Sequence, residues 1–160
     1  MVSVEEFQLE DLWKELEPMF RIGLSGKKIG LTWEVKVPLP PLRTDKIKVK
    51  GILSNIVFNA IKFTDQGKIH VCASLVQGDA VEIEIKDTGV GIRPELIPVI
   101  FEPFRQAEST VGRSQGGAGL GLSIAKKLID LLHGRVEVES DEGQGSTFRI
   151  ALPIQHAART

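Results

Sequence analysis

Gly116-Gly117-Ala118-Gly119-Leu120-Gly121-Leu122 is followed directly by Ser123-Ile124-Ala125-Lys126-Lys127-Leu128, so a glycine-rich segment leads into a helical pattern. The apolar residues of that pattern recur at steps of three and four, which predicts a helix over about 120–133. Glycines before a helix allow backbone N–H groups to close around an anion, because no Cβ stands in the way. The segment indicates a site for a nucleotide phosphate, although a flexible turn has the same pattern when taken alone.

The composition is that of an ordinary globular domain. The chain has 160 residues, of which 42% are hydrophobic and 26% charged, and its formal net charge is −1. These values predict one domain over 1–160, with a core of about 7–153 and loose ends at 1–6 and 154–160. Linker-like residues after Met1 suggest a domain excised from a longer protein, or a natural stand-alone one. We expect a cytoplasmic location, whether or not a parent protein is anchored in a membrane.

Charge and hydropathy exclude several other classes of function. A nearly neutral chain is not expected to bind nucleic acid or a membrane surface through general electrostatic attraction. No apolar run approaches the roughly 18 residues of a membrane span. Cys72 is the only cysteine, and we expect a packing or surface thiol on the same strand face as His70. The three histidines show no metal-ligand spacing in the sequence.

Periodicity predicts helices and strands in mixed order. Asp45 precedes the longest helical pattern and is a suitable N-cap. A turn at Gln77-Gly78-Asp79 predicts a hairpin, and Gly134 is a suitable helix C-cap. The predicted fold class is an α/β (α+β) two-layer sandwich, with a mixed sheet of about five strands covered on one face by about three helices. The expected helices are 9–20, 45–63, 94–100 (short) and 120–133, and the expected strands are 31–37, 68–76, 81–86, 135–140 and 146–152.

Two asparagines and a lysine follow one stripe of the long predicted helix. Asn55 and Asn59 are four residues apart, and Lys62 is three residues further on. The amide oxygen of Asn59 is a suitable ligand for Mg²⁺, which prefers oxygen and keeps several waters, and the Lys62 ammonium can meet phosphate oxygens. The same stripe is equally consistent with a solvated helix edge.

Asp87 stands at the end of a predicted strand, followed by Gly89 and Gly91. An ionised carboxylate only accepts hydrogen bonds, so it can bind the amino group of adenine, and the glycines leave room for a planar base. A plain Asp-x-Gly turn is the alternative. Near the end of the chain, the glycine turn before Thr147 is either a simple hairpin turn or the floor of the base pocket.

Phe101-Glu102-Pro103-Phe104 precedes a long segment without periodicity, 105–117. Two aromatic residues around a proline usually pack against a core. A long loop in a compact domain is usually functional or mobile. Arg105 and Arg113 belong to this segment, and each can either reach a terminal phosphate or remain a surface charge.

Taken together and in order, these motifs resemble the ATP-binding catalytic domain of sensor histidine kinases, a GHKL-type fold. The resemblance covers about 7–153 and includes the helix around Asn55, the turn after Asp87, the Phe101 element, the glycine loop before Gly121 and the final glycine turn. In this family a loop called the ATP lid follows the Phe101 motif. The sequence at the start of this loop, Phe104-Arg105-Gln106-Ala107-Glu108, is most similar to the lids of hybrid-type histidine kinases.

The resemblance implies roles for individual residues. Asn59 would ligate Mg²⁺, Lys62 would contact phosphate, Asp87 would bind adenine, and 105–116 would form the ATP lid. The implied catalytic residues are Asn55, Lys62, Arg105 and Arg113. The implied ATP-binding residues are Asn55, Asn59, Lys62, Asp87, Gly89, Gly91, Ile92, Phe104, Gly117, Gly119, Leu120, Gly121, Leu122 and Thr147.

Asn55 distinguishes phosphotransfer from hydrolysis. Hydrolytic relatives carry a glutamate at the matching position to activate water, whereas an asparagine is a poor general base. The resemblance therefore implies a kinase that donates the γ-phosphoryl of Mg·ATP to a histidine on a separate helical dimerisation domain. A response regulator receiver domain would act downstream, with no nucleic acid and no direct membrane contact. A nucleotide-binding regulatory module and a GHKL-type ATPase or serine kinase remain the alternatives.

Overall fold

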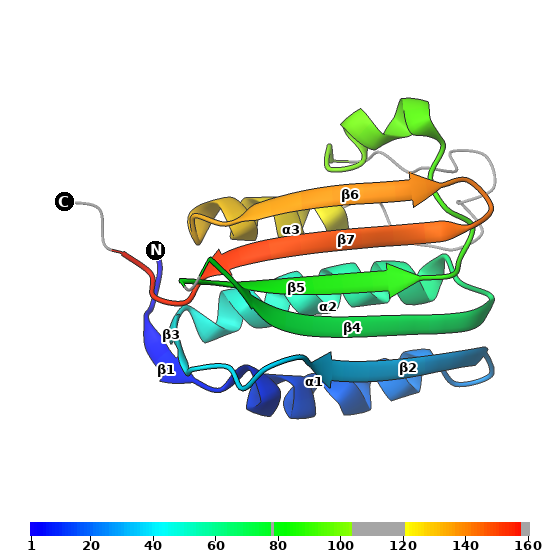
Figure 1. The fold of residues 1–160 in the computed structure, drawn as a ribbon. Coiled ribbons are helices and arrows are strands. Elements are labelled where there is room, and N and C mark those ends of the chain that lie inside the picture. Colours follow the sequence, from blue (N-terminus) through cyan, green and yellow to red (C-terminus); the bar gives the residue numbers. More distant parts are fainter. Residues whose placement is uncertain (78, 104–120, 158–160) are drawn as a thin grey trace.

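The computed structural model describes residues 1–77, 79–103 and 121–157 and contains one large sheet with helices on one face (Figure 1). The five strands of this sheet lie in the order β2-β4-β5-β7-β6. The pair β2 and β4 is parallel, whereas the other three pairs are antiparallel. The strands are β2 (Lys28–Val35), β4 (Gln66–Val76), β5 (Ala80–Asp87), β6 (Arg135–Asp141) and β7 (Gly145–Pro153).

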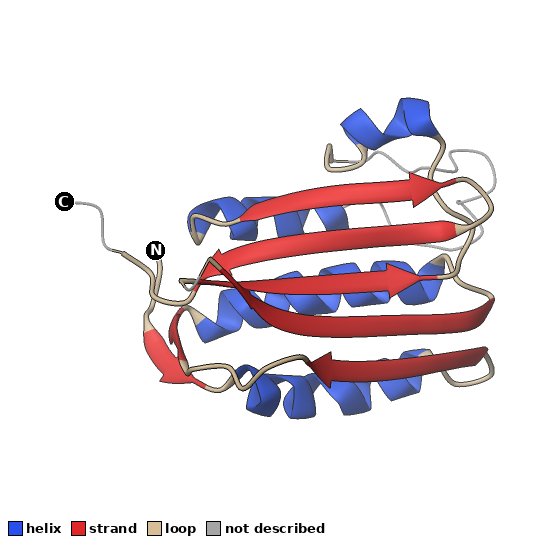
Figure 2. Cartoon of the chain, in the orientation of Figure 1, coloured by secondary structure: helices blue, strands red, loops and turns tan. Residues whose placement is uncertain are grey.

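In the described residues, three α-helices form the second layer, and all lie behind the sheet in the views of Figures 1 and 2. They are α1 (Leu9–Gly23), α2 (Lys46–Lys62) and α3 (Gly121–Leu131), and a 3₁₀ helix, η1 (Pro94–Val99), follows β5. The predicted two-layer sandwich with a mixed five-strand sheet is therefore confirmed.

The core lies between the sheet and the helices. Ile83 and Ile85 of β5 and Phe148 and Ile150 of β7 are fully or almost fully buried, because side chains alternate along a strand and these share one face. The helices supply the opposite side of the core with apolar residues at helical spacing. Even-numbered residues of β7 and odd-numbered residues of β5 therefore point toward the helices.

The helix ends follow local rules. Asp45 caps α2 as expected, and its carboxylate accepts a hydrogen bond from Lys48 N at 3.1 Å. At the end of α3, His133 rather than Gly134 has the left-handed conformation, with φ at 61°. Gly134 is required for a different reason, since a Cβ there would lie 2.6 Å from the Ala151 carbonyl oxygen.

Loose ends were expected at 1–6 and 154–160, and part of each end has backbone partners, while residues 158–160 lie outside the described residues. Glu5 and Glu6 belong to β1 (Glu5–Phe7), which pairs with β3 (Leu42–Thr44) in a separate two-stranded sheet. After β7, Ile154 O accepts a hydrogen bond from Arg43 N, and His156 N donates one to Arg43 O, each at 2.8 Å. Residues 5–7, 154 and 156 are therefore held by backbone hydrogen bonds to β3. Three-residue strands are too short for alternation to reveal them in a sequence.

Candidate active site

The polar stripe of α2 lies next to the first turn of α3. Asn55, Asn59 and Lys62 are all half-buried. Asn55 Nδ2 donates a hydrogen bond to Gly51 O at 2.7 Å, which fixes the direction of its amide. A Cβ on Gly121 would lie 3.3 Å from Asn55 Oδ1, so glycine at this position allows α3 to begin close to the amide. The structure therefore brings the predicted asparagine and the end of the glycine segment together.

Asn59 and Lys62 differ in their surroundings. Within the described residues, the side chain of Asn59 forms no hydrogen bond, so its amide oxygen remains available to a ligand. Lys62 Nζ lies 5.3 Å from the centroid of the Phe63 ring, which keeps the ammonium near the end of α2. An available amide oxygen is the type of donor that Mg²⁺ accepts.

Asp87 is a buried carboxylate at the end of β5, only 6% exposed. Its Oδ1 accepts hydrogen bonds from Gly89 N at 2.8 Å and from Ser146 N at 3.3 Å. Burial raises the pKa of Asp87, and these two hydrogen bonds oppose the shift without cancelling it. The carboxylate therefore has backbone donors for one oxygen and a local environment that disfavours its charge.

Glycines let the backbone close around Asp87. A Cβ on Gly89 would lie 2.3 Å from Phe63 O, which brings the turn after β5 against the end of α2. Gly145 has φ at +111°, and its Cβ would lie 2.0 Å from Asp87 O. Gly91 has φ at +73°, and its Cβ would lie 2.2 Å from Asp141 O. No residue with a side chain fits at these three positions without a backbone shift.

The hydroxyl of Thr64 is a further polar group at this place that the sequence analysis missed. Thr64 is 0% exposed, and its Oγ1 has no hydrogen-bond partner in the part of the chain that the structure describes. A Cβ on Gly89 would lie 2.8 Å from Thr64 Oγ1 and 3.0 Å from Asp87 Oδ1, so both oxygens converge on the same glycine. A buried hydroxyl without a partner is costly, and a bound polar molecule would relieve that cost.

The structure corrects the position of Thr147. The residue paired with Asp87 is Ser146, whereas Thr147 pairs with Lys86. Side chains alternate along β7, so Ser146 shares the helix-facing side with Phe148, and Thr147 belongs to the other face. The predicted place of Thr147 at the floor of the base pocket is therefore wrong. The alternation of Phe148, Ile150 and Leu152 contained this signal in the sequence.

Ser146 belongs to a small hydroxyl network, another feature that the sequence analysis missed. Ser140 Oγ lies 3.0 Å from Ser146 Oγ and donates a hydrogen bond to Gly145 O at 2.9 Å. The same Ser140 oxygen accepts a hydrogen bond from Ile92 N at 2.7 Å. This network connects the turn after β5 to the strands β6 and β7. Ile92 itself is 7% exposed and packs in the hydrophobic core.

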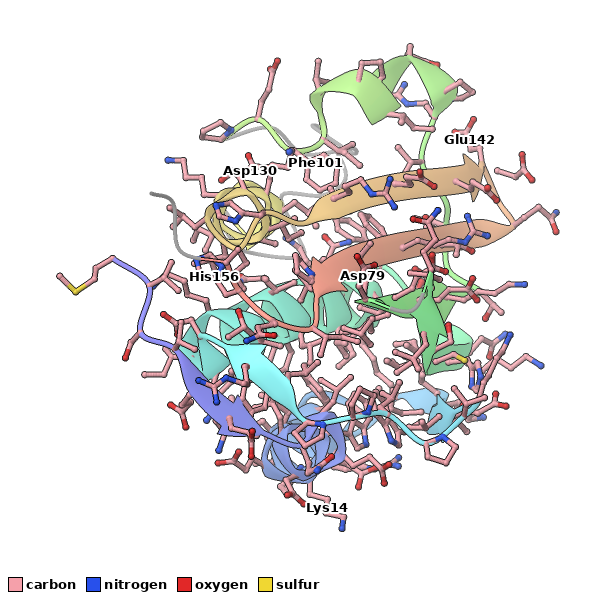
Figure 3. The ribbon with its side chains drawn as sticks, turned by 60° about the vertical axis from the view of Figure 1, so that its left-hand side comes forward. Lys14, Asp79, Phe101, Asp130, Glu142 and His156 are labelled. Carbon is pink, nitrogen blue, oxygen red and sulfur yellow. The ribbon has the colours of Figure 1, made fainter. Side chains whose placement is uncertain are left out.

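The remaining predicted residues divide into two groups. Leu122 packs against the core. The Phe101 ring contacts the Phe148 ring edge-on at 6.3 Å between centroids, so the expected packing role is present. Figure 3 shows Phe101 between η1 and β6. The predicted lid, 105–116, lies outside the described residues. So do the predicted site residues Phe104, Arg105, Arg113, Gly117, Gly119 and Leu120.

Residues 44–156 match the family described as Histidine kinase-, DNA gyrase B-, and HSP90-like ATPase. The chain belongs to this ATPase family. Within it, the chain is a catalytic, ATP-binding domain of the sensor histidine kinase type. It is 40% identical over 158 residues to the autoinducer 2 sensor kinase/phosphatase LuxQ of Vibrio cholerae, a match that covers 96% of the chain. It is also 40% identical over 159 residues to the sensor histidine kinase RcsC of Escherichia coli, with 98% covered.

Solved structures of histidine kinases have the same fold. Full-length ShkA in complex with AMPPNP is 33% identical, with a TM-score of 0.87 over 99% of this chain and 33% of that one. The nucleotide-free catalytic domain of ThkA is 28% identical, with a TM-score of 0.80 over 96% of this chain and 97% of that one. This ATPase-family domain spans only 18% of LuxQ and 16% of RcsC. Within its described residues, no helix is long and apolar enough to cross a membrane.

Proposed function

We propose that residues 1–160 act as one unit that binds Mg·ATP and donates the γ-phosphoryl to a histidine of a separate helical domain. The observation that carries the proposal is the buried Asp87 carboxylate, which has backbone donors on Oδ1 and the unpartnered Thr64 hydroxyl nearby. A carboxylate acceptor beside a backbone turn without side chains suits the amino edge of adenine. In this proposal Ser146, rather than Thr147, completes the base site.

The phosphates would lie between α2 and the first turn of α3. The N-terminus of a helix carries partial positive charge and free N–H groups, and here it begins at Gly121 beside Asn55. Lys62 supplies a positive charge on the same stripe of α2 as Asn59, whose amide oxygen would hold Mg²⁺. When bound, the metal would offset the charge of the phosphate oxygens.

The residues of the stripe favour transfer over hydrolysis. Asn55 already donates to Gly51 O, and an amide does not remove a proton from water near neutral pH. The domain would therefore hold ATP until an acceptor histidine arrives, with catalysis by positioning and charge neutralisation. A helical dimerisation domain would supply that histidine, and a response regulator receiver domain would accept the phosphoryl next. A solved ThkA structure is described as a complex with the response regulator protein TrrA. We place the reaction in the cytoplasm, where ATP is available.

The metal assignment is tested by calorimetric titration of the full chain with ATP, in Mg²⁺ and in EDTA. Asn59→Ala should weaken binding by roughly three- to tenfold in Mg²⁺ and leave metal-free binding nearly unchanged, because the lost oxygen serves the metal. The matched control is Ser54→Ala on the same helix, whose hydroxyl bonds to its own helix at Lys50 O. Equal losses in Mg²⁺ and EDTA would contradict the assignment.

Transfer is tested with γ-labelled ATP, with and without the helical acceptor domain of a LuxQ-type kinase. The chain alone should release phosphate slowly and carry no label. With the acceptor, an acid-labile and base-stable label should form on the acceptor histidine. Rapid phosphate release by the chain alone would favour an ATPase. ATP binding without any transfer to several acceptor domains would favour a regulatory nucleotide-binding module.

A further inference from the structure

A cluster of three potential metal ligands lies on the face of the sheet opposite the helices. Glu34 of β2 pairs with Cys72 of β4 in the parallel register, and His70 is on the same face two residues before Cys72. One ligand atom from each of the three residues lies within 4.8 Å of the other two. The pairing of β2 with β4 creates this cluster, so no sequence spacing could reveal it.

The arrangement suits a zinc-like cation. Zinc binds thiolate, imidazole and carboxylate at about 2.0–2.3 Å, which places tetrahedral ligand atoms about 3.3–3.8 Å apart. His70 Nε2 already lies 2.9 Å from Glu34 Oε1, and small side-chain rotations would complete the triangle. Cys72 is a free thiol, 6% exposed, at the base of the cluster, whereas Glu34 is exposed and able to swing aside for entry.

The ring of His70 is held in place by a second contact. Its Nδ1 hydrogen-bonds with the Thr32 hydroxyl, from the residue opposite it on β2. In metal sites, a hydrogen bond to the second ring nitrogen typically fixes the orientation of the ligating one. Here it directs Nε2 toward Glu34, on the side where a cation would bind.

Glu34 is the carboxylate best placed to complete the cluster. Glu84 pairs with Cys72 across β4 and β5, but its carboxylate lies 3.0 Å from Arg149 Nε and forms an ion pair with it. Lys86 pairs with His70 across the same two strands, so a cation stands on that side of the histidine. Among the described residues, Glu34 is the acidic residue whose carboxylate oxygen lies within 4.8 Å of the ligand atoms of both His70 and Cys72.

We propose that Glu34, His70 and Cys72 bind one divalent cation of the zinc class, with the fourth coordination position open to solvent. This site is independent of the proposed ATP site, because it lies on the other face of the sheet from α2 and α3. Three protein ligands leave the cation able to accept a ligand from outside, as in other open zinc sites. The cation would join the edge strand β2 to β4.

The test uses Co²⁺ as a spectroscopic probe of the purified chain under reducing conditions. One equivalent should produce visible bands and a sulfur–cobalt band in the near ultraviolet, and Zn²⁺ should displace it. Cys72→Ser should abolish the sulfur–cobalt band, and His70→Gln and Glu34→Gln should each weaken binding by at least about tenfold. The matched controls are Glu82→Gln, from the same face, and His156→Gln, and neither should change the affinity.

A second measurement makes the result independent of the spectrum. Zn²⁺ should raise the melting temperature of the wild-type chain, EDTA should reverse the rise, and Cys72→Ser and Glu34→Gln should lose it. ATP affinity should be the same with and without Zn²⁺, which separates this site from the ATP site. The absence of a sulfur–cobalt band in the wild-type chain, or equal Co²⁺ affinity in wild type and Glu34→Gln, would overturn the proposal.

Discussion

Asp45 and Asp87 are both nearly buried, at 3% and 6% exposure, yet their pKa values move in opposite directions. Burial tends to raise the pKa of Asp45, but hydrogen bonds from Ser3 and Lys48 outweigh burial and lower it. Both oxygens of Asp45 accept hydrogen bonds, one of them from the Lys48 ammonium at 2.9 Å. Asp87 has backbone donors on Oδ1 alone among the described residues, and burial raises its pKa.

This difference separates a carboxylate that supports the fold from one that is suited to a ligand. A buried charge with a full set of donors and a cation is satisfied within the protein. A buried charge with donors on one oxygen and no cation partner retains acceptor capacity for something outside the chain. The two aspartates thus serve as controls for each other. Substitution of Asp45 should mainly reduce the stability of the fold, whereas substitution of Asp87 should mainly weaken ATP binding.

The largest expected effect is on stability, at Asp45. Asp45→Ala should lower the free energy of unfolding by about 2–4 kcal/mol, because it removes the helix cap and takes the carboxylate partner from the half-buried Lys48. The affinity for ATP should stay within about twofold. Urea unfolding measures the stability, with exposed Asp65→Ala as the control. A decrease in the free energy of unfolding below about 0.5 kcal/mol would be no larger than that of an ordinary surface substitution. It would contradict the view that Asp45, unlike Asp87, supports the fold.

The next effect is on ATP binding, at Asp87. Asp87→Ala should weaken ATP binding roughly ten- to hundredfold, since a lost hydrogen bond between buried groups costs about 1–3 kcal/mol. Asp87→Asn should also weaken it, because its amide presents a donor where the adenine amino group needs an acceptor. Calorimetry with ATP and GTP measures both variants. Unchanged ATP affinity in both would show that Asp87 does not bind adenine.

A smaller effect should appear in the pH dependence of stability, with opposite signs at the two sites. The lowered pKa of Asp45 gives stability that is present above its ordinary value of 3.8 and is lost as the pH falls through the lower folded value. The raised pKa of Asp87 means that the native state binds the proton more tightly, so stability decreases as the pH rises from 3.8 through the raised value.

Asp45→Asn should therefore be less stable than wild type at neutral pH, and the gap should close in acid. Asp87→Asn should gain stability relative to wild type as the pH rises. Unfolding curves at a series of pH values compare each variant with wild type. Parallel pH profiles for the two variants would contradict the assigned shifts.

The smallest effect concerns the two hydroxyls at the start of β7. Ser146→Ala should weaken ATP binding by roughly three- to tenfold, because it removes a hydroxyl of the network beside Asp87. Thr147→Ala should leave the affinity unchanged, since Thr147 is on the other face of the sheet. Paired calorimetric titrations provide the comparison. A larger loss of ATP affinity for Thr147→Ala than for Ser146→Ala would contradict the replacement of Thr147 by Ser146 at the base site.

The sequence was informative wherever a local pattern repeated. Alternation predicted all five strands of the large sheet, and the steps of three and four predicted α1, α2 and α3. The cap at Asp45 was predictable because its acceptor role involves only the next three residues. Family membership followed from five motifs in order, and the comparisons confirm it.

What the sequence could not provide depends on register and on distant contacts. The pairing of Asp87 with Ser146 needs the register of β5 against β7, which neither strand contains alone. The orphaned Thr64 hydroxyl depends on the approach of Gly89 to the end of α2. The cluster at Cys72 depends on the parallel partner β2, which a separate helix and a short strand divide from β4 along the chain.

The two ends of the described chain share one anchor, and this has a mechanical consequence. β1 pairs with β3 from one side, and the segment after β7 hydrogen-bonds with Arg43 in the same strand; both ends lie on the same side of the molecule in Figure 1. Tension applied through the two ends would load the three residues of β3 before it reached the large sheet. Since Asp45 directly follows β3, that tension would pull on the first turn of α2, the helix that holds Asn55 and Asn59.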